Sequence, residues 1–175
     1  MPISVSCRKG STGNNWTSWI CPDENGQLPL HKAFCDNATI ALGSIKLLVK
    51  GNPSAITCAD KNGMTPLHVA CQHHESPSIV EYLLDLDPSS SHVLDFDDNT
   101  MLHHACLGAN HAVITLLLDK KYGSMSVSER NAHGQLPIDL LLENNEFCDE
   151  ESVKYTESIY RLLRANPETI INSII

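Results

Sequence analysis

The chain lacks the excess of cationic residues that nucleic-acid binding requires. It has 12 Lys and Arg against 21 Asp and Glu, which gives a net charge of −9 with neutral histidine. Phosphate backbones are bound through clustered Lys and Arg, and anionic membrane surfaces attract the same residues. The composition therefore argues against nucleic-acid and membrane partners, and it weakly favours a protein partner with a basic patch.

Long apolar runs and paired cysteines are also missing. Runs such as "AVITLLL" fall far short of the roughly 20 residues that span a bilayer, and the first residues contain no apolar signal-peptide core. The seven cysteines form no CxxC pair, a pattern typical of reduced thiols in a cytosolic or nuclear protein. We expect a soluble monomer in the cytoplasm, with the nucleus as the alternative location.

No recognised catalytic or cofactor motif is present. The chain has no nucleophile elbow, P-loop, GxGxxG or HExxH sequence. The segments "CQHH" (71–74) and "HHAC" (103–106) contain metal-binding residue types, but their spacing matches no known ligand pattern. The sequence therefore predicts a protein that is not an enzyme, with no catalytic residue, no metal and no cofactor.

One segment recurs along the chain. Its copies are "DENGQLPLHKAF" from Asp23, "DKNGMTPLHVAC" from Asp60, "DFDDNTMLHHAC" from Asp95 and "NAHGQLPIDLLL" from Asn131. Equivalent positions are separated by 37, 35 and 36 residues. A fixed period of this length is the signature of a stacked repeat array.

Each copy has the features of a turn followed by a helix pair. A glycine suits a turn with positive φ, and a proline that follows fits the first position of a helix. The hydroxyl of Thr65 can cap such a helix. A second helix is marked by "SIKLLVK", "IVEYLLD", "VITLLLDKK" and "IYRLLR", which carry apolar residues at helical spacing. One pair cannot bury both its faces, so the copies are expected to stack.

These segments resemble ankyrin repeats, whose T-P-L-H-x-A signature is closest in "GQLPLHKA" and "GMTPLHVA". The third copy departs from it at Asp98 and Met101, and the fourth has Asp139 in the histidine position. The resemblance covers roughly Asp23 to Asn166. It implies an all-α repeat solenoid of stacked helix-turn-helix ankyrin repeats with β-hairpin loops.

On this basis we expect six segments along the chain. They are an irregular N-terminal cap (1–22), repeat 1 (23–57), repeat 2 (58–94), repeat 3 (95–130), repeat 4 (131–168) with an acidic loop insertion (143–152), and a C-terminal tail (169–175).

His31, His68 and His103 occupy the same position in successive repeats. A catalytic histidine needs one specific nucleophile or carboxylate beside it, whereas repetition indicates a role in the scaffold. The resemblance implies that each hydrogen-bonds within its own turn and to the neighbouring repeat. The residues expected to be structural are Gly26, Pro29, His31, Gly63, Thr65, Pro66, His68, Thr100, His103, Gly134 and Pro137.

The resemblance also implies a binding surface made of the hairpin tips and the concave face of the first helices. The matching tip residues are Glu24, Asn25, Gln27, Lys61, Asn62, Met64, Phe96, Asp97, Asn99, His133 and Gln135, and the matching helix residues are Gln72, His73 and Leu107. An exposed Phe96 beside Met64 would form an apolar anchor; the alternative is that Phe96 packs under its own hairpin.

Three functions fit this surface. The first is a non-enzymatic protein–protein interaction module that binds through the tips and the concave face. The second is a regulatory subunit or inhibitor of an enzyme, with the acidic loop 143–152 reaching a basic cleft. The third is a structural segment of a longer ankyrin scaffold protein.

Overall fold

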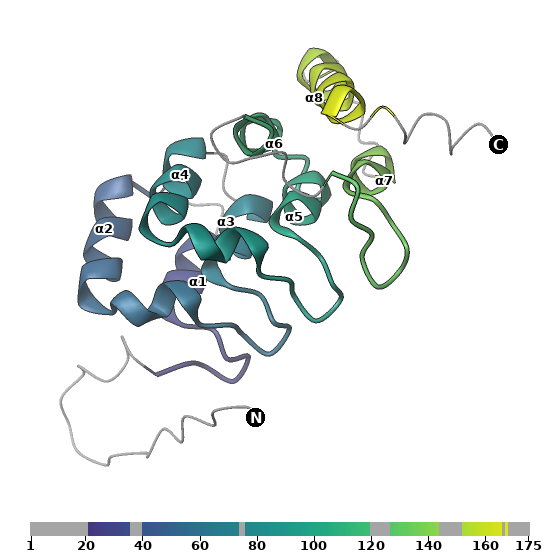
Figure 1. The fold of residues 1–175 in the computed structure, drawn as a ribbon. Coiled ribbons are helices and arrows are strands. Elements are labelled where there is room, and N and C mark those ends of the chain that lie inside the picture. Colours follow the sequence, from purple (N-terminus) through teal and green to yellow (C-terminus); the bar gives the residue numbers. More distant parts are fainter. Residues whose placement is uncertain are drawn as a thin grey trace, which may run out of the picture.

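The computed structural model describes residues 21–35, 40–73, 76–119, 127–143, 152–165 and 167, and these form a row of helices (Figure 1). The helices are α1 (Pro29–Cys35), α2 (Leu42–Gly51), α3 (Pro66–His73), α4 (Pro77–Leu86), α5 (Met101–Leu107), α6 (His111–Leu117), α7 (Pro137–Glu143) and α8 (Ser152–Ala165). Two short 3₁₀ helices, η2 (Pro53–Thr57) and η3 (Pro88–His92), follow α2 and α4.

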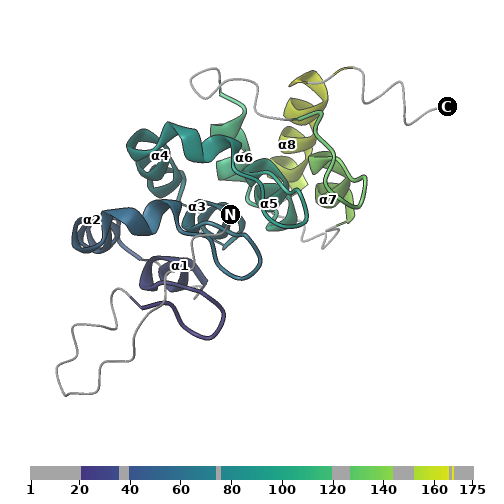
Figure 2. The same cartoon turned by 60° about the horizontal axis from the view of Figure 1, so that its bottom comes forward.

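The helices form two layers. α1, α3, α5 and α7 pack in sequence as the first helices of successive pairs, and α2, α4, α6 and α8 lie beside them as the second layer (Figures 1 and 2). Each pair rests on its neighbours, so the apolar faces of the pairs join into one elongated core. The predicted all-α repeat solenoid is confirmed.

The loops that precede the first helices are turns, and no strand occurs in the described part of the chain. Successive turns are joined by single backbone hydrogen bonds. Lys61 N donates to Asn25 O over 3.0 Å, Phe96 N to Asn62 O over 3.0 Å, and Ala132 N to Asp97 O over 2.8 Å. The turn tips are therefore tied into one continuous edge of the row.

Each turn is closed by a side chain at its first position. Oδ1 of Asp60 accepts hydrogen bonds from the backbone N–H groups of Asn62 and Met64, at 2.8 and 3.0 Å. The equivalent Oδ1 atoms of Asp23, Asp95 and Asn131 accept two backbone N–H groups in the same way. These carboxylates and amides replace water as acceptors, which holds each turn in one conformation.

A left-handed residue follows in every turn. It is glycine in three of them, with φ of 79°, 79° and 76° at Gly26, Gly63 and Gly134. In the third turn Asp98 takes this role at φ 58°. Aspartate is among the few non-glycine residues that enter this region readily, so the missing glycine does not change the turn.

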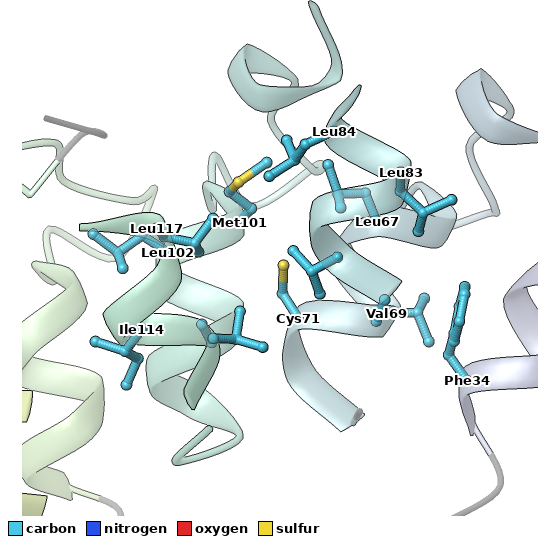
Figure 3. Close-up of a cluster of buried hydrophobic side chains, with 14 of the residues drawn as sticks. Phe34, Leu67, Val69, Cys71, Leu83, Leu84, Met101, Leu102, Ile114 and Leu117 are labelled. Atoms are coloured by element: carbon cyan, nitrogen blue, oxygen red, sulfur yellow. The ribbon is translucent and has the colours of Figure 1, made fainter. Parts of the chain in front are cut away.

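The core is built from apolar side chains of consecutive pairs (Figure 3). Phe34, Leu67 and Leu102 come from α1, α3 and α5, and each is at most 1% exposed. Cys71 and Cys106 are fully buried among them, where burial raises the pKa of both thiols. They serve here as small apolar residues that let neighbouring helices approach.

Candidate functional site

The histidine of each TPLH-type motif joins its own turn to the next pair. His31 Nδ1 accepts the Leu28 N–H over 3.2 Å, and His31 Nε2 lies 3.1 Å from Met64 O. A backbone N–H can only donate and a carbonyl can only accept. The proton of His31 is therefore on Nε2, and the ring must be neutral to make both bonds.

His68 and His103 repeat this arrangement. Nδ1 accepts the N–H of Thr65 or Thr100 at 3.1 and 3.2 Å, while Nε2 faces Val93 O or Gln135 O at 3.0 and 3.1 Å. The threonine hydroxyls also lie within 3.0 Å of Nδ1. In the third repeat the Thr100 hydroxyl additionally caps α5 by accepting the His103 N–H.

Burial lowers the pKa of all three histidines, and it lowers the pKa of His68 to about 4. Protonation would also place an N–H on Nδ1 against a backbone N–H donor, which the hydrogen-bond geometry opposes. These side chains are thus held in their neutral form, and they satisfy backbone groups between repeats.

Asp139 stands in this position in the fourth repeat. Its Oδ2 accepts the Leu136 N–H over 2.8 Å, which reproduces the bond that Nδ1 makes in the histidine repeats. A carboxylate has no N–H to pass to a following carbonyl. The chain of histidine links therefore stops at α7.

A buried His104–Asp95 pair was not predicted from the sequence. His104 Nε2 lies 2.8 Å from Asp95 Oδ2, and the side chains are 4% and 5% exposed. Burial lowers the pKa of His104 more than Asp95 raises it. Burial raises the pKa of Asp95, but hydrogen bonds from Asn99 and His104 outweigh it and hold that pKa below its usual value. The pair ties the third turn to α5.

The turn-tip surface contains most of the predicted binding residues. Seven of them are exposed: Glu24, Asn25, Lys61, Asn62, Phe96, Asp97 and His133. Four are half-buried because they take part in the turns or in packing: Gln27, Met64, Asn99 and Gln135. Asn131 Nδ2 donates to Asn99 Oδ1 over 2.9 Å, a bond that links the third and fourth turns.

Phe96 is the most prominent apolar residue of this surface. It is 74% exposed, so most of the side chain faces solvent. One edge of the ring lies on Gly63 of the preceding turn, where an added Cβ would be 2.6 Å from Phe96 Cδ1 and 2.8 Å from Phe96 N. The absence of a side chain at Gly63 therefore makes room for the ring.

The predicted first-helix residues lie elsewhere. Gln72, His73 and Leu107 are at the C-terminal ends of α3 and α5, opposite the ends that adjoin the turns. They line a cleft of about 760 Å³ together with residues of the α5–α6 connection and of α8, which include Lys154 and Glu157. The structure thus separates the candidate residues into a turn-tip surface and a helix-end cleft.

Two further observations limit the chemistry of the described residues. They contain no group of three His, Cys, Asp or Glu side chains arranged to hold a metal ion. Within the same residues, no helix has the length and apolar character needed to cross a membrane. Of the predicted acidic loop 143–152 only Glu143 and Ser152 are described, and the tail 169–175 lies outside the described residues, as do residues 1–20 of the predicted cap.

The stacked pairs and their repeated hydrogen bonds define a helical repeat protein. Residues 12–92 match the family model for ankyrin repeats (3 copies), so this segment of the chain is similar to ankyrin repeats. The match begins inside the segment predicted as an irregular cap. No curated protein matches the sequence. Ankyrin repeats are generally protein–protein interaction modules and are typically without enzymatic activity.

Proposed function

We propose that the chain is a non-enzymatic module that binds a partner protein through its turn tips, with Phe96 as the central anchor. The observation that carries this proposal is the 74% exposure of Phe96 on a rigid edge of the stack. Aromatic side chains dominate binding energy at protein interfaces when a partner pocket covers them.

The edge is organised before any partner arrives. Asp95 holds two backbone N–H groups of the Phe96 turn, and the Phe96 N–H is itself bonded to Asn62 O at 3.0 Å. Binding therefore needs little further ordering of the backbone, and ordering is a main cost of association.

The charges beside Phe96 indicate what the partner presents. Asp97 and Asp98 follow it directly, and both are exposed. An apolar pocket with a basic rim would complement this tip, because opposite charges at a rim increase the association rate. This is consistent with the net charge of −9.

Phe96→Ala tests the proposal against a matched control, Leu47→Ala. Leu47 on α2 is 71% exposed, so the control removes a similar amount of exposed apolar surface from another place. Partners captured from a native lysate by wild-type protein should bind Phe96→Ala roughly 30-fold more weakly, a typical loss at an anchor residue. The control should bind as wild type does.

Equal capture by all three proteins would refute a turn-tip site. Circular dichroism of each variant would show that the helices are intact. Inhibition of a captured enzyme by the wild-type chain, measured with purified components, would assign the narrower role of a regulatory subunit.

A further inference from the structure

The fourth helix pair leaves uncovered a position that earlier pairs bury. Phe34, Cys71 and Cys106 occupy equivalent places in α1, α3 and α5, and each is 0% exposed. Leu142 has this place in α7 and is 43% exposed. The next first helix covers the position in the earlier pairs, whereas no described residue covers Leu142 in that way.

The second helices show a smaller difference in the same direction. Glu81 of α4 and Thr115 of α6 are half-buried, while Tyr160 at the equivalent place in α8 is 58% exposed. Lys46 is one residue before this position in α2, and its Nζ lies 5.3 Å from the ring centroid of Tyr82 in the following pair. This side of the second helix therefore faces the next pair along the row, and Tyr160 faces outward from the end of the row.

The opposite side of α8 confirms this direction. Ser158 is 1% exposed, and its Oγ lies 3.0 Å from His111 Nδ1 on α6. Two residues correspond to about 200° of helix rotation, so Tyr160 points away from α6. Val153, about two turns earlier on the same side of the helix as Tyr160, is 76% exposed.

Continuation of the stack by the same histidine link is not supported at this end. The link requires an N–H donor, and Asp139 offers only carboxylate oxygens. A head-to-tail contact that imitates a fifth repeat would lack the hydrogen bond that joins the earlier repeats.

The charges on α8 are instead complementary to a second α8. Glu157 and Arg164 lie on either side of Tyr160, seven residues or about 10 Å apart. Both are exposed. Glu157 Oε1 accepts Arg161 Nε over 2.7 Å within the helix, so Oε2 can meet a cation of another molecule. Two antiparallel copies of α8 with Tyr160 near the axis would bring each Glu157 opposite the other copy's Arg164.

We propose that the end face formed by Leu142, Val153 and Tyr160 binds a second copy of this chain through an isologous contact of α8 with α8. Such a contact is self-complementary and closes as a two-fold dimer. It goes beyond the proposed partner binding, because it uses the end of the row and leaves the turn tips of both copies free.

Sedimentation equilibrium over a concentration series up to about 1 mM tests the proposal, a range that reaches weak association. Wild-type protein should show a reversible monomer–dimer equilibrium. Tyr160→Glu and Val153→Glu should each weaken the dimer at least about tenfold, because a charge would be buried without a partner. Leu47→Glu places the same charge at an equally exposed apolar residue of α2 and should dimerise as wild type does.

A charge exchange tests the geometry. The proposed dimer contains two symmetric contacts between residue 157 of one copy and residue 164 of the other. Glu157→Arg alone makes both contacts arginine against arginine, and Arg164→Glu alone makes both glutamate against glutamate. Each variant should dimerise at least about tenfold more weakly than wild type. Mixed in equal amounts they should form a heterodimer of about wild-type strength, since both contacts then join opposite charges.

The proposal is overturned if wild-type protein stays monomeric through the series, or if it forms open chains instead of dimers. It is also overturned if the mixed variants stay apart, or if Tyr160→Glu added to one of them leaves their association unchanged. Circular dichroism of each variant distinguishes a lost contact from a lost fold.

Discussion

The second and fourth helix pairs share one sequence pattern but differ in what surrounds them. In α3, His68 accepts a hydrogen bond from the Thr65 N–H of its own turn and donates one to Val93 O. In α7 it is Asp139, which bonds its turn only among the described contacts. Cys71 is fully buried, whereas Leu142 is 43% exposed. Burial in a repeat protein is therefore set by the next repeat as much as by residue type.

The largest expected contrast in the free energy of unfolding is between Phe34 of α1 and Leu142 of α7, which occupy equivalent positions. Phe34→Ala should lower the free energy of unfolding by about 3–5 kcal/mol, because it leaves a cavity in the core. Leu142→Ala should lower it by less than about 1 kcal/mol, since the side chain is already partly in water. Urea unfolding followed by circular dichroism measures both values, and equal losses would show that the fourth pair is covered after all.

Removal of the histidine link should give the second largest loss in the free energy of unfolding. His68→Ala leaves the Thr65 N–H without its acceptor and Val93 O without its donor, at a cost of about 2–4 kcal/mol. Asp139→Ala removes a single turn bond and should cost about 1 kcal/mol. The same urea titrations decide between these values. A loss at Asp139 as large as that at His68 would mean that the fourth repeat makes a second strong bond.

Acidification should weaken the histidine repeats. The folded-state pKa of His68 is about 4, below its ordinary value of 6.5, so the unfolded chain binds the proton first. The free energy of unfolding should then fall between about pH 7 and pH 4, by roughly 2 kcal/mol at pH 5 from His68 alone. Burial shifts the pKa of His31 and His103 in the same direction, so they add to the loss.

Thermal unfolding at a series of pH values measures this dependence. Asp95 contributes in a separate and lower range, because its pKa lies below the ordinary 3.8 and its contribution is lost only as the pH falls through that value. His68→Ala should flatten the slope between pH 7 and pH 5. A stability that does not change over this range would contradict neutral buried histidines.

The smallest expected effect is that of restoring the histidine in the fourth repeat. Asp139→His restores the donor that the fourth repeat lacks, and Nδ1 can still accept the Leu136 N–H. We expect a change within about 0.5 kcal/mol, because no following repeat supplies a carbonyl in the described structure. A gain of about 1 kcal/mol or more in urea unfolding would reveal an acceptor beyond α7.

The sequence by itself determined the repeat, its period and its local chemistry. The turn glycines, the helix-starting prolines and the apolar spacing act over a few residues, so they can be recognised without a fold. The positions of His31, His68 and His103 followed from the same period. The turn-closing role of Asp23, Asp60, Asp95 and Asn131 was not predicted, although it recurs at the same spacing and could have been found there.

Only the tertiary structure decided what depends on distant segments. Three such features each join residues from different turns or helices: the His104–Asp95 pair, the contact of Phe96 with Gly63 and the cleft beside α8. The exposure of Tyr160 was decided in the same way, since the equivalent helix position is half-buried in α4 and α6. A local pattern states which face of a helix is apolar, but only the packed neighbours determine whether that face is covered.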